Sequence, residues 1–397
     1  LSLLAVFLVR FTVADLWIWK SSNKLAEGLC AHNYDIHGIV TVASQVRLPE
    51  LERFRIAEQL VQPTVRVRTG AVRRLADSES PDRIRYVEYA GLGFAADIRM
   101  GKPIEITASK LLKLSPHVLY TNVVEPILRW TFVGKGYALV HAACMAHEGH
   151  AFLITARTDT GKTTTCLKTL DAHPYAFVSD DLTILTPDGR ALTYPKPLTI
   201  SRHTLTAVKR PRLSRRERFM LIYQSRLHSK SGRWFGLLLA KLRLPAATMN
   251  AIVQLIVPPP KYQVDRLVPH AEIAPEAKLA GLVIIQRGGE GGELLERDEA
   301  LQILLENCDD AYGFPPYPEI EHFLHSRNGS DLLGVERRII EMALGETPAT
   351  LLKSEARDWY LRLPSIVEAR IAANGNGNGR AGRAALEAAL AAGPATR

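Results

Sequence analysis

Short runs of alternating apolar and polar residues dominate the first third of the chain. Four such runs, rich in β-branched residues, lie at 34–43, 63–68, 84–89 and 93–98. Alternation with a period of two is typical of strands with one buried face. We therefore predict a small, mostly antiparallel β-rich module. Apolar residues at helical spacing follow at 122–132 and predict a helix.

An apolar strand pattern at 152–155 leads directly into a glycine-lysine-threonine turn. Gly161, Lys162 and Thr163 follow the strand, and a helical pattern begins after them. Backbone N–H groups at such a turn and helix start face phosphate oxygens, aided by the helix dipole. The lysine supplies a positive charge to the β- and γ-phosphates, and the threonine hydroxyl supplies a ligand to Mg²⁺. The segment predicts binding of a nucleoside triphosphate.

A second apolar segment at 175–185 carries two adjacent carboxylates, Asp180 and Asp181. Two acids within an apolar strand are costly unless a cation lies opposite them. An Mg²⁺ ion held beside Thr163 is such a cation. The turn departs from the phosphate-binding pattern G-x-x-x-x-G-K-[ST] at Ala156, where the pattern has glycine. The two segments together still favour phosphoryl chemistry.

Four runs in this order resemble the HPr kinase/phosphorylase superfamily, which shares a P-loop fold with phosphoenolpyruvate carboxykinases. The runs are LVHAA at 139–143, GHAFLIT at 149–155, DTGKT at 159–163 and FVSDD at 177–181. The similarity extends over about residues 120–200 and is fainter at 34–49 and 307–317. It implies an α/β fold with a P-loop nucleotide-binding core, to which the residue pattern adds the N-terminal β-rich module and a helical basic insertion.

The resemblance also implies roles for individual residues. Asp181 is expected to take a proton from a substrate hydroxyl, with Asp180 and His141 alongside and Lys162 on the phosphates. By itself His141 is typical of a core histidine, and only the resemblance places it near the transferred phosphate. Thr163 and Asp180 are the expected metal ligands. The expected nucleotide-binding residues are Thr158, Asp159, Thr160, Gly161, Lys162, Thr163 and Thr164.

One departure concerns the acceptor. The superfamily's Glu-Ile-Arg-Gly segment, which engages metal and protein substrate, is absent, and the equivalent region reads YPKPLTISR at 194–202. The resemblance therefore supports the fold and the nucleotide more than it supports HPr as substrate.

The pattern divides the chain into five parts. We predict an N-terminal extension at 1–33, the β-rich module at 34–120, a kinase-like core at 121–345, a C-terminal helix at 346–369 and a flexible tail at 370–397. The core contains the basic helical insertion at 203–262.

Positive charge is concentrated in one segment. Residues 209–243 hold eleven lysines and arginines and one acid, Glu217, which gives a local charge near +10 against +9 for the whole chain. Apolar runs at 219–223 and 234–242 interleave with these charges. The mixture is typical of an interfacial helix on anionic lipid. It is equally typical of a helical hairpin with a solvated basic face, and nucleic acid is a weaker third alternative because no binding motif accompanies the charge.

The remaining features point to an ordinary intracellular protein. The four cysteines (Cys30, Cys144, Cys166 and Cys308) have neither zinc-site nor disulfide spacing, so we expect a reducing cytoplasm, with or without contact to a membrane surface. Residues 1–9 are apolar but far short of the roughly 20 residues that span a bilayer. We expect them to pack on the body, the alternative being the end of a longer membrane segment. His147 and His150 are separated like a metal-binding pair, but no third ligand accompanies them.

These observations predict an ATP-dependent, Mg²⁺-requiring kinase that transfers phosphate to a hydroxyl. A serine of a peptide or protein is the acceptor class that the resemblance implies, and a small-molecule hydroxyl is not separable from it. We also expect a homo-oligomer and no nucleic-acid partner. The alternative is a nucleotide-binding regulatory or scaffold protein, with or without membrane association, that lacks transfer activity.

Overall fold

The computed structural model describes residues 30–72, 82–88, 93–227, 245–312, 316–325, 331–375 and 379–391. The chain divides into two compact units: Leu1–Glu125 with Arg226–Pro259, and Pro126–Ser225 with Pro260–Arg397. Both units combine helices with mixed sheets, so the protein is of the α/β class, as predicted. The apolar segment 1–9 lies outside the described residues.

The first unit contains a seven-stranded sheet in the order β3-β1-β2-β4-β7-β6-β5. Two of its neighbouring pairs, β2–β4 and β4–β7, are parallel, and the other described pairs are antiparallel. The strands are β1 (His32–Ile36), β2 (Val40–Ser44), β3 (Arg55–Ile56), β4 (Val65–Thr69), β5 (Arg83–Val87), β6 (Ala95–Arg99) and β7 (Ile104–Ala108).

The single strand predicted at 34–43 is instead a hairpin of β1 and β2. His37 and Gly38 have φ angles of 57° and 67°, so the chain reverses between the two strands. Glycine adopts this left-handed conformation without steric cost. His37 is exposed and lies in this turn.

Helices cover part of this first sheet. They are the 3₁₀ helix η1 (Pro49–Phe54), α2 (Lys110–Leu114), α3 (Pro116–Leu119), the π-helical turn η3 (Tyr120–Val124) and α9 (Ala246–Ile256). Helix α9 is fastened by the Thr248 hydroxyl, which accepts from the N–H of Phe94 at 2.8 Å, and by Ser115, whose hydroxyl donates to the carbonyl of Ala251 at 2.7 Å.

The predicted insertion at 203–262 is divided between the two units. Helix α9 belongs to the first unit, whereas α6 (Arg202–Leu205) and most of α7 (Arg215–Leu227) belong to the second. Residues 228–244 lie outside the described residues.

The second unit is built on a nine-stranded sheet in the order β11-β9-β10-β16-β13-β12-β8, with β18 beside β16 and β17 beside β18. Strands β10, β16 and β18 run parallel at its centre. Its strands are β8 (Ala138–Val140), β9 (Ala142–His147), β10 (His150–Thr155), β11 (Ala176–Ser179), β12 (Thr183–Leu185), β13 (Arg190–Leu192), β16 (Glu276–Gln286), β17 (Gly291–Leu295) and β18 (Ala349–Lys353). A separate two-stranded sheet joins β14 (Leu198–Thr199) and β15 (Lys261–Tyr262).

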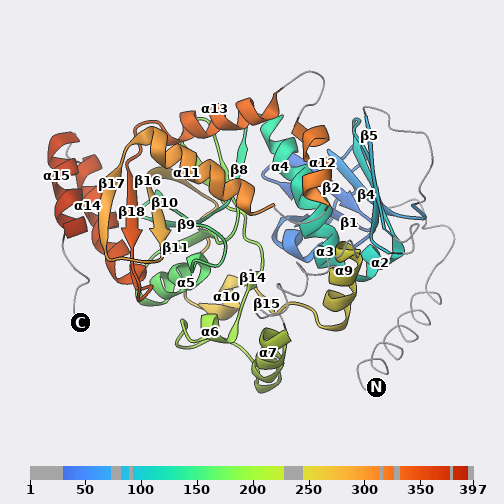
Figure 1. Ribbon diagram of the computed structural model, residues 1–397, viewed down its shortest axis with the longest axis horizontal. Coiled ribbons are helices and arrows are strands. Elements are labelled where there is room, and N and C mark those ends of the chain that lie inside the picture. The colour runs from blue at the N-terminus through green and yellow to red at the C-terminus, as the bar shows by residue number, and fades with distance from the viewer. Residues whose placement is uncertain are drawn as a thin grey trace. The chain divides into compact units, whose positions relative to one another are not determined.

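Successive side chains of the central strands point to opposite faces of this sheet, and helices pack on both faces. Phe152 and Ile154 of β10 join a core cluster with Leu167 of α5 (Lys162–Ala172). Helices α14 (Trp359–Gly375) and α15 (Gly379–Ala391) pack into the same cluster. Helices α11 (Arg297–Asp310) and α13 (Leu332–Leu344) contact β8 from the opposite side, and Figure 1 shows them across the sheet from α5. A strand with both faces covered reads as a continuous apolar run, as 152–155 does.

Two short helices complete the described part of this unit: α10 (Val264–Leu267) and α12 (Tyr317–His325). Helix α4 (Glu125–Val133) begins at the boundary between the units and matches the helix predicted at 122–132. Within the described residues, no helix has the length and apolar character needed to cross a membrane.

The C-terminal part differs from the predicted helix at 346–369 and flexible tail at 370–397. The first range also holds strand β18, which pairs with β16. The second continues α14 to Gly375 and then forms α15. Leu386 and Leu390 of α15 are buried in the core cluster, so apolar side chains spaced by four residues anchor this helix.

Candidate functional site

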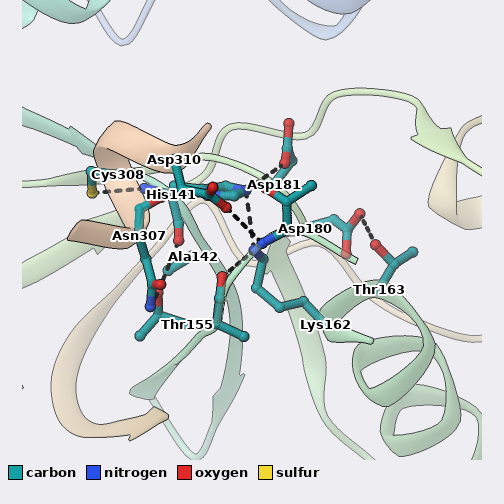
Figure 2. A network of polar contacts seen from close by, with 12 residues as sticks. His141, Ala142, Thr155, Lys162, Thr163, Asp180, Asp181, Asn307, Cys308 and Asp310 are labelled. Atoms are coloured by element: carbon teal, nitrogen blue, oxygen red, sulfur yellow. Dashed lines mark hydrogen bonds and ion pairs between the residues drawn. The ribbon is translucent and has the colours of Figure 1, made fainter. Parts of the chain in front are cut away.

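The predicted site residues meet at the carboxyl end of β10. The strand ends at Thr155, and residues 156–161 form a turn that leads into α5. His141 follows β8, and Asp180 and Asp181 follow β11. Figure 2 shows these side chains converging around the ammonium of Lys162. The carboxyl end of a central parallel strand is where open α/β sheets bind ligands.

Residues 156–161 form the turn that precedes Lys162 and Thr163, and it is called the Gly-Lys-Thr turn below. This turn requires glycine at its last position, Gly161. Gly161 has a φ of 136°, and a Cβ there would lie 3.3 Å from the Trp359 ring. Asp159 also has a positive φ, of 65°. Arg287 spans the turn by donating to the carbonyls of Thr160, at 3.1 Å, and Asp159. One guanidinium therefore holds two carbonyls of the turn from outside, and the first N–H groups of α5 are the donors that an anion could use.

Lys162 is buried and lies at the centre of the site. Its ammonium donates to the carbonyl of Ala156 at 2.9 Å and lies 3.1 Å from Nε2 of His141. Burial lowers the pKa of this lysine, and the carboxylates of Asp181 and Asp180 oppose that shift. An ammonium held this way is a cation kept close to where phosphate oxygens would lie.

Asp180 and Thr163 form the pair predicted to hold a metal. The Thr163 hydroxyl donates to Oδ2 of Asp180 at 2.8 Å, whereas the buried Oδ1 of Asp180 has no hydrogen-bond partner. Burial and the neighbouring Asp181 raise the pKa of Asp180 to about 6. An unpartnered buried carboxylate oxygen is costly, and a cation is the partner that removes the cost.

These two residues fit Mg²⁺. The ion keeps several waters and is usually held by one or two protein ligands together with substrate phosphates. The described residues contain no cluster of three or more histidine, cysteine or acidic side chains that could hold a metal by themselves. A metal here would therefore depend on oxygens supplied by a bound phosphate.

Asp181 carries the second carboxylate and is half exposed. Its Oδ2 accepts from the Lys196 ammonium at 2.7 Å, and its Oδ1 lies 3.2 Å from Nε2 of His141. Burial opposes ionisation of Asp181, but Lys196 and His141 outweigh it and hold the pKa of this carboxyl well below its usual range. The pKa values of the two adjacent acids are thus driven apart, because that of Asp181 is lowered and that of Asp180 is raised.

His141 is held in a defined tautomer. Its Nδ1 lies 2.8 Å from the carbonyl of Asn307, and because a carbonyl only accepts, Nδ1 carries a proton. Its backbone N–H donates to the Cys308 sulfur, and its carbonyl accepts from Thr155. The Nε2 atom therefore accepts from Lys162 when the ring is neutral, or donates to Asp181 when the ring is protonated.

The carboxyl end of α11 supplies this support. Asn307 also donates from its side chain to the Thr155 hydroxyl at 3.2 Å, and Asp310 accepts from the N–H of Thr158 at 2.9 Å. The buried Arg129 anchors this helix end by donating to Asp309 at 3.0 Å, and it also donates to Glu336 of α13 through two nitrogens at 2.8 Å each. Residues distant in sequence thus position both His141 and the turn.

All ten predicted site residues lie at this site or in its turn. His141, Lys162, Thr163, Asp180 and Asp181 form one connected group, while Thr158, Asp159, Thr160 and Gly161 shape the turn. Thr164 lies half-buried on the first turn of α5. Sequence reasoning assigned no role to Lys196, Arg287, Asn307 and Asp310, because each lies outside the four matching runs and reaches the site only through the fold.

The chain matches no protein-family model, and it matches no curated protein sequence.

Proposed function

We propose that this protein is an ATP-dependent, Mg²⁺-requiring kinase that transfers phosphate to a hydroxyl group. One observation carries the proposal: a buried lysine, a threonine–aspartate pair with an unpartnered carboxylate oxygen, and an ionised aspartate beside a histidine meet at one glycine-containing turn. Phosphoryl transfer needs these parts, because its catalysis consists of positioning and charge stabilisation. The acceptor class, a serine of a peptide or protein, rests on the resemblance to the HPr kinase/phosphorylase superfamily.

Phosphate binding falls to the turn and Lys162. The N–H groups at the start of α5 point to where the phosphates would lie. Lys162 exchanges its bond to the Ala156 carbonyl for the β- and γ-phosphate oxygens. Asp310 accepts from the N–H of Thr158, so a phosphate using that donor takes the place of the Asp310 carboxylate.

Thr163 and Asp180 hold the metal. When bound, Mg²⁺ neutralises charge on the phosphates. The Thr163 hydroxyl donates its proton to Oδ2 of Asp180, so its oxygen could coordinate the ion, which would also give the free Oδ1 of Asp180 a partner.

Asp181 orients the acceptor hydroxyl and takes its proton. The carboxylate is ionised, as a base must be, and it is half exposed, so an acceptor has access to it. Nε2 of His141 lies 3.2 Å from Oδ1 of Asp181 and is the next group along a proton path. Lys196 holds the other carboxylate oxygen and so fixes the direction of the base.

A second candidate is a nucleotide-binding regulatory or scaffold protein without transfer activity. It is favoured by the ion pair between Asp181 and Lys196, because a carboxylate whose pKa is held low is a weak base. Ala156, in place of the first glycine of the pattern, also favours it.

The deciding experiment measures ATP binding and ADP release by the purified chain with Mg²⁺ and a library of serine peptides. Lys162→Ala should weaken ATP binding by at least about tenfold, the loss of one charge-assisted contact. Asp181→Asn should leave binding within about twofold but slow transfer by at least about a hundredfold, the usual contribution of a general base. Lys168→Ala on the same helix and Asp188→Asn are matched controls that should change neither quantity.

The outcomes separate the two candidates. ATP binding that requires Lys162, with transfer that requires Asp181, establishes the kinase. ATP binding without transfer to any peptide or small-molecule hydroxyl favours the scaffold. A chain that binds no nucleotide contradicts both.

A further inference from the structure

A cavity of about 570 Å³ opens at the end of β10 opposite the Gly-Lys-Thr turn. His150, the first residue of β10, lines it together with its register partner Lys278 on β16. Arg370 of α14 and Glu346 complete its charged lining, and Leu279 and Ile371 contribute apolar surface. A strand of six residues spans about 20 Å, so this cavity is separate from the site described above.

Positive charge in this cavity exceeds negative charge. Arg370 is half-buried, and its Nε donates to the carbonyl of Ala280 at 3.0 Å. Among the described residues its guanidinium forms no ion pair, and burial lowers its pKa. Lys278 is an exposed ammonium, and Glu346 is the one acid in the lining. Among the described residues, no carboxylate is paired with the N–H donors of the Arg370 guanidinium, so these donors could bind an anion.

His150 adds an oriented nitrogen. Its Nδ1 donates to the carbonyl of Glu148 at 3.0 Å, which leaves Nε2 for a ligand. We infer that this cavity binds a small organic oxyanion, a phosphate or carboxylate on a short apolar body. The guanidinium fork matches either group, and the volume lies within the range of small-molecule sites.

Calorimetry with phenyl phosphate and with benzoate tests this site, because the two probes share an apolar body and carry the two anionic groups. The full chain with Lys162→Ala serves as the parent, so that phosphate binding at the turn is weakened. The parent should bind one or both probes, and Arg370→Gln or Lys278→Gln should weaken binding by about tenfold, the value of one charge-assisted contact. Arg190→Gln, an exposed arginine paired with Lys278 in the sheet register, is the matched control and should have no effect.

A parent that binds neither probe overturns the inference, and so does unchanged binding by both the Arg370 and Lys278 variants. Lys278→Gln alone decides the question if Arg370→Gln does not fold, because the Lys278 side chain is exposed. The result is independent of the proposed kinase activity, since no variant other than the Lys162→Ala parent touches the turn.

A different observation concerns helix α7, which exposes large apolar side chains. Phe219 is 71% exposed, Met220 47% and Ile222 37%, whereas Leu221 is fully buried and anchors the helix. Burying such apolar surface is favourable, so this face is suited to a partner that removes it from water.

Arginines surround these apolar side chains. Arg215, Arg216 and Arg218 are exposed, and the helix's acid, Glu217, is engaged by Arg266 at 2.9 Å. Arg215, Arg218, Phe219 and Ile222 have the spacing i, i+3, i+4, i+7, which places them on one stripe of the helix.

We propose that α7 docks on an anionic phospholipid surface. The arginines match the headgroup charge, and Phe219, Met220 and Ile222 enter the boundary of the acyl chains. Nucleic acid would use the arginines but would leave the apolar side chains in water, so lipid is the better fit.

Flotation with two kinds of vesicle tests α7, one of phosphatidylcholine alone and one that also contains phosphatidylserine. The full chain should bind only the second. Arg215→Gln, Arg216→Gln and Arg218→Gln together should weaken binding on the order of a hundredfold, at about one kilocalorie per arginine. Phe219→Ser with Ile222→Ser should weaken it by about tenfold or more.

Matched controls carry the same changes elsewhere. Arg68→Gln, Arg99→Gln and Arg338→Gln remove three exposed charges, and Met342→Ser removes an exposed apolar side chain. Equal loss in the controls, binding that ignores phosphatidylserine, or tighter binding to a DNA or RNA duplex than to vesicles contradicts lipid docking through α7.

Discussion

The carbonyl of Asn307 accepts a hydrogen bond from Nδ1 of His141 at 2.8 Å, although 166 positions separate the two residues. This bond fixes which histidine nitrogen faces Lys162 and Asp181. The Asn307 side chain meanwhile ties α11 to the Thr155 hydroxyl at the end of β10. One residue of α11 thus positions a histidine and the strand that precedes the turn.

Replacing Asn307 by alanine should therefore disturb catalysis more than nucleotide binding. The lost bond to Thr155 should lower the free energy of unfolding by about 1 kcal/mol. Alanine keeps the backbone carbonyl that accepts from His141, but without the side-chain bond the end of α11 is less firmly tied to β10, so this carbonyl and His141 should shift and transfer should slow by about tenfold. The Kd for ATP should stay within about twofold of the parent. Thr155→Val removes the same bond from its other end, together with the bond from the Thr155 hydroxyl to the His141 carbonyl. The double variant should therefore lose less unfolding free energy than the sum of the two single changes. Additive effects, or an equal loss of ATP affinity, would show that Asn307 does not act through this bond.

Asp180→Asn should separate metal binding from stability. The parent holds a buried carboxylate oxygen without a partner, and an amide removes the charge while keeping an oxygen for Thr163. The variant should unfold at higher urea concentration in EDTA, gaining about 1 kcal/mol or more from the relieved desolvation cost. Its Mg²⁺ requirement for ATP binding should rise by about tenfold, since a charged ligand is lost. A variant that is less stable than the parent in EDTA, or needs no more Mg²⁺, contradicts the assignment of Asp180 to the metal.

Arg287→Ala tests whether the turn must be held from outside. Arg287 donates to the carbonyls of Asp159 and Thr160, so its removal leaves the turn free to adopt other conformations. ATP affinity should fall by about tenfold through lost pre-organisation, with a change of about 1 kcal/mol or less in unfolding free energy. Arg297→Ala is a matched control, because Arg297 donates to the single carbonyl of Glu341 at 2.9 Å on α13. Equal ATP affinity in the two variants would mean that Arg287 does not organise the turn.

A pH-dependent prediction concerns the first unit. Burial opposes ionisation of Asp97, but hydrogen bonds and charge from Arg83 and Arg85 lower its pKa. A lowered pKa means that the folded state binds fewer protons than the unfolded state. The stabilisation is therefore present above about pH 4, the ordinary aspartate pKa, and is lost as the pH falls through the lowered value.

Asp97→Asn should accordingly cost about 2 kcal/mol at pH 7, as expected for one partner of a mostly buried ion pair. The difference from the parent should shrink as the pH is lowered, and urea unfolding at several pH values measures it. Glu58→Gln, which neutralises an exposed acid, should show no such dependence. A difference that is constant across this range would mean that charge is not the cause.

The local pattern of apolar and polar residues was enough to predict several elements of the second unit. The apolar run at 152–155, the turn after it and the helix that begins at Lys162 were all predicted, because they depend on side-chain period and backbone conformation within a few residues. The acids at Asp180 and Asp181 were identified because charge within an apolar segment is visible in sequence. The single strand predicted there was wrong, since the two acids lie between β11 and β12. The class of fold, α/β, followed from these alternating patterns.

Tertiary structure alone decided how the site is supported. Lys196, Arg287, Asn307 and Asp310 carry no local signal, because their contacts close loops of 15 to 152 residues that no periodicity encodes. The assignment of α9 to the first unit and the packing of α15 likewise depend on long-range contacts, which offset the loss of chain entropy only once the sheet is formed. The reversal at His37 and Gly38 is instead a local turn that the alternating pattern did not reveal. The sequence by itself specified which chemical groups this protein carries, whereas the packing of β8, β10, β11 and α11 determined that these groups meet.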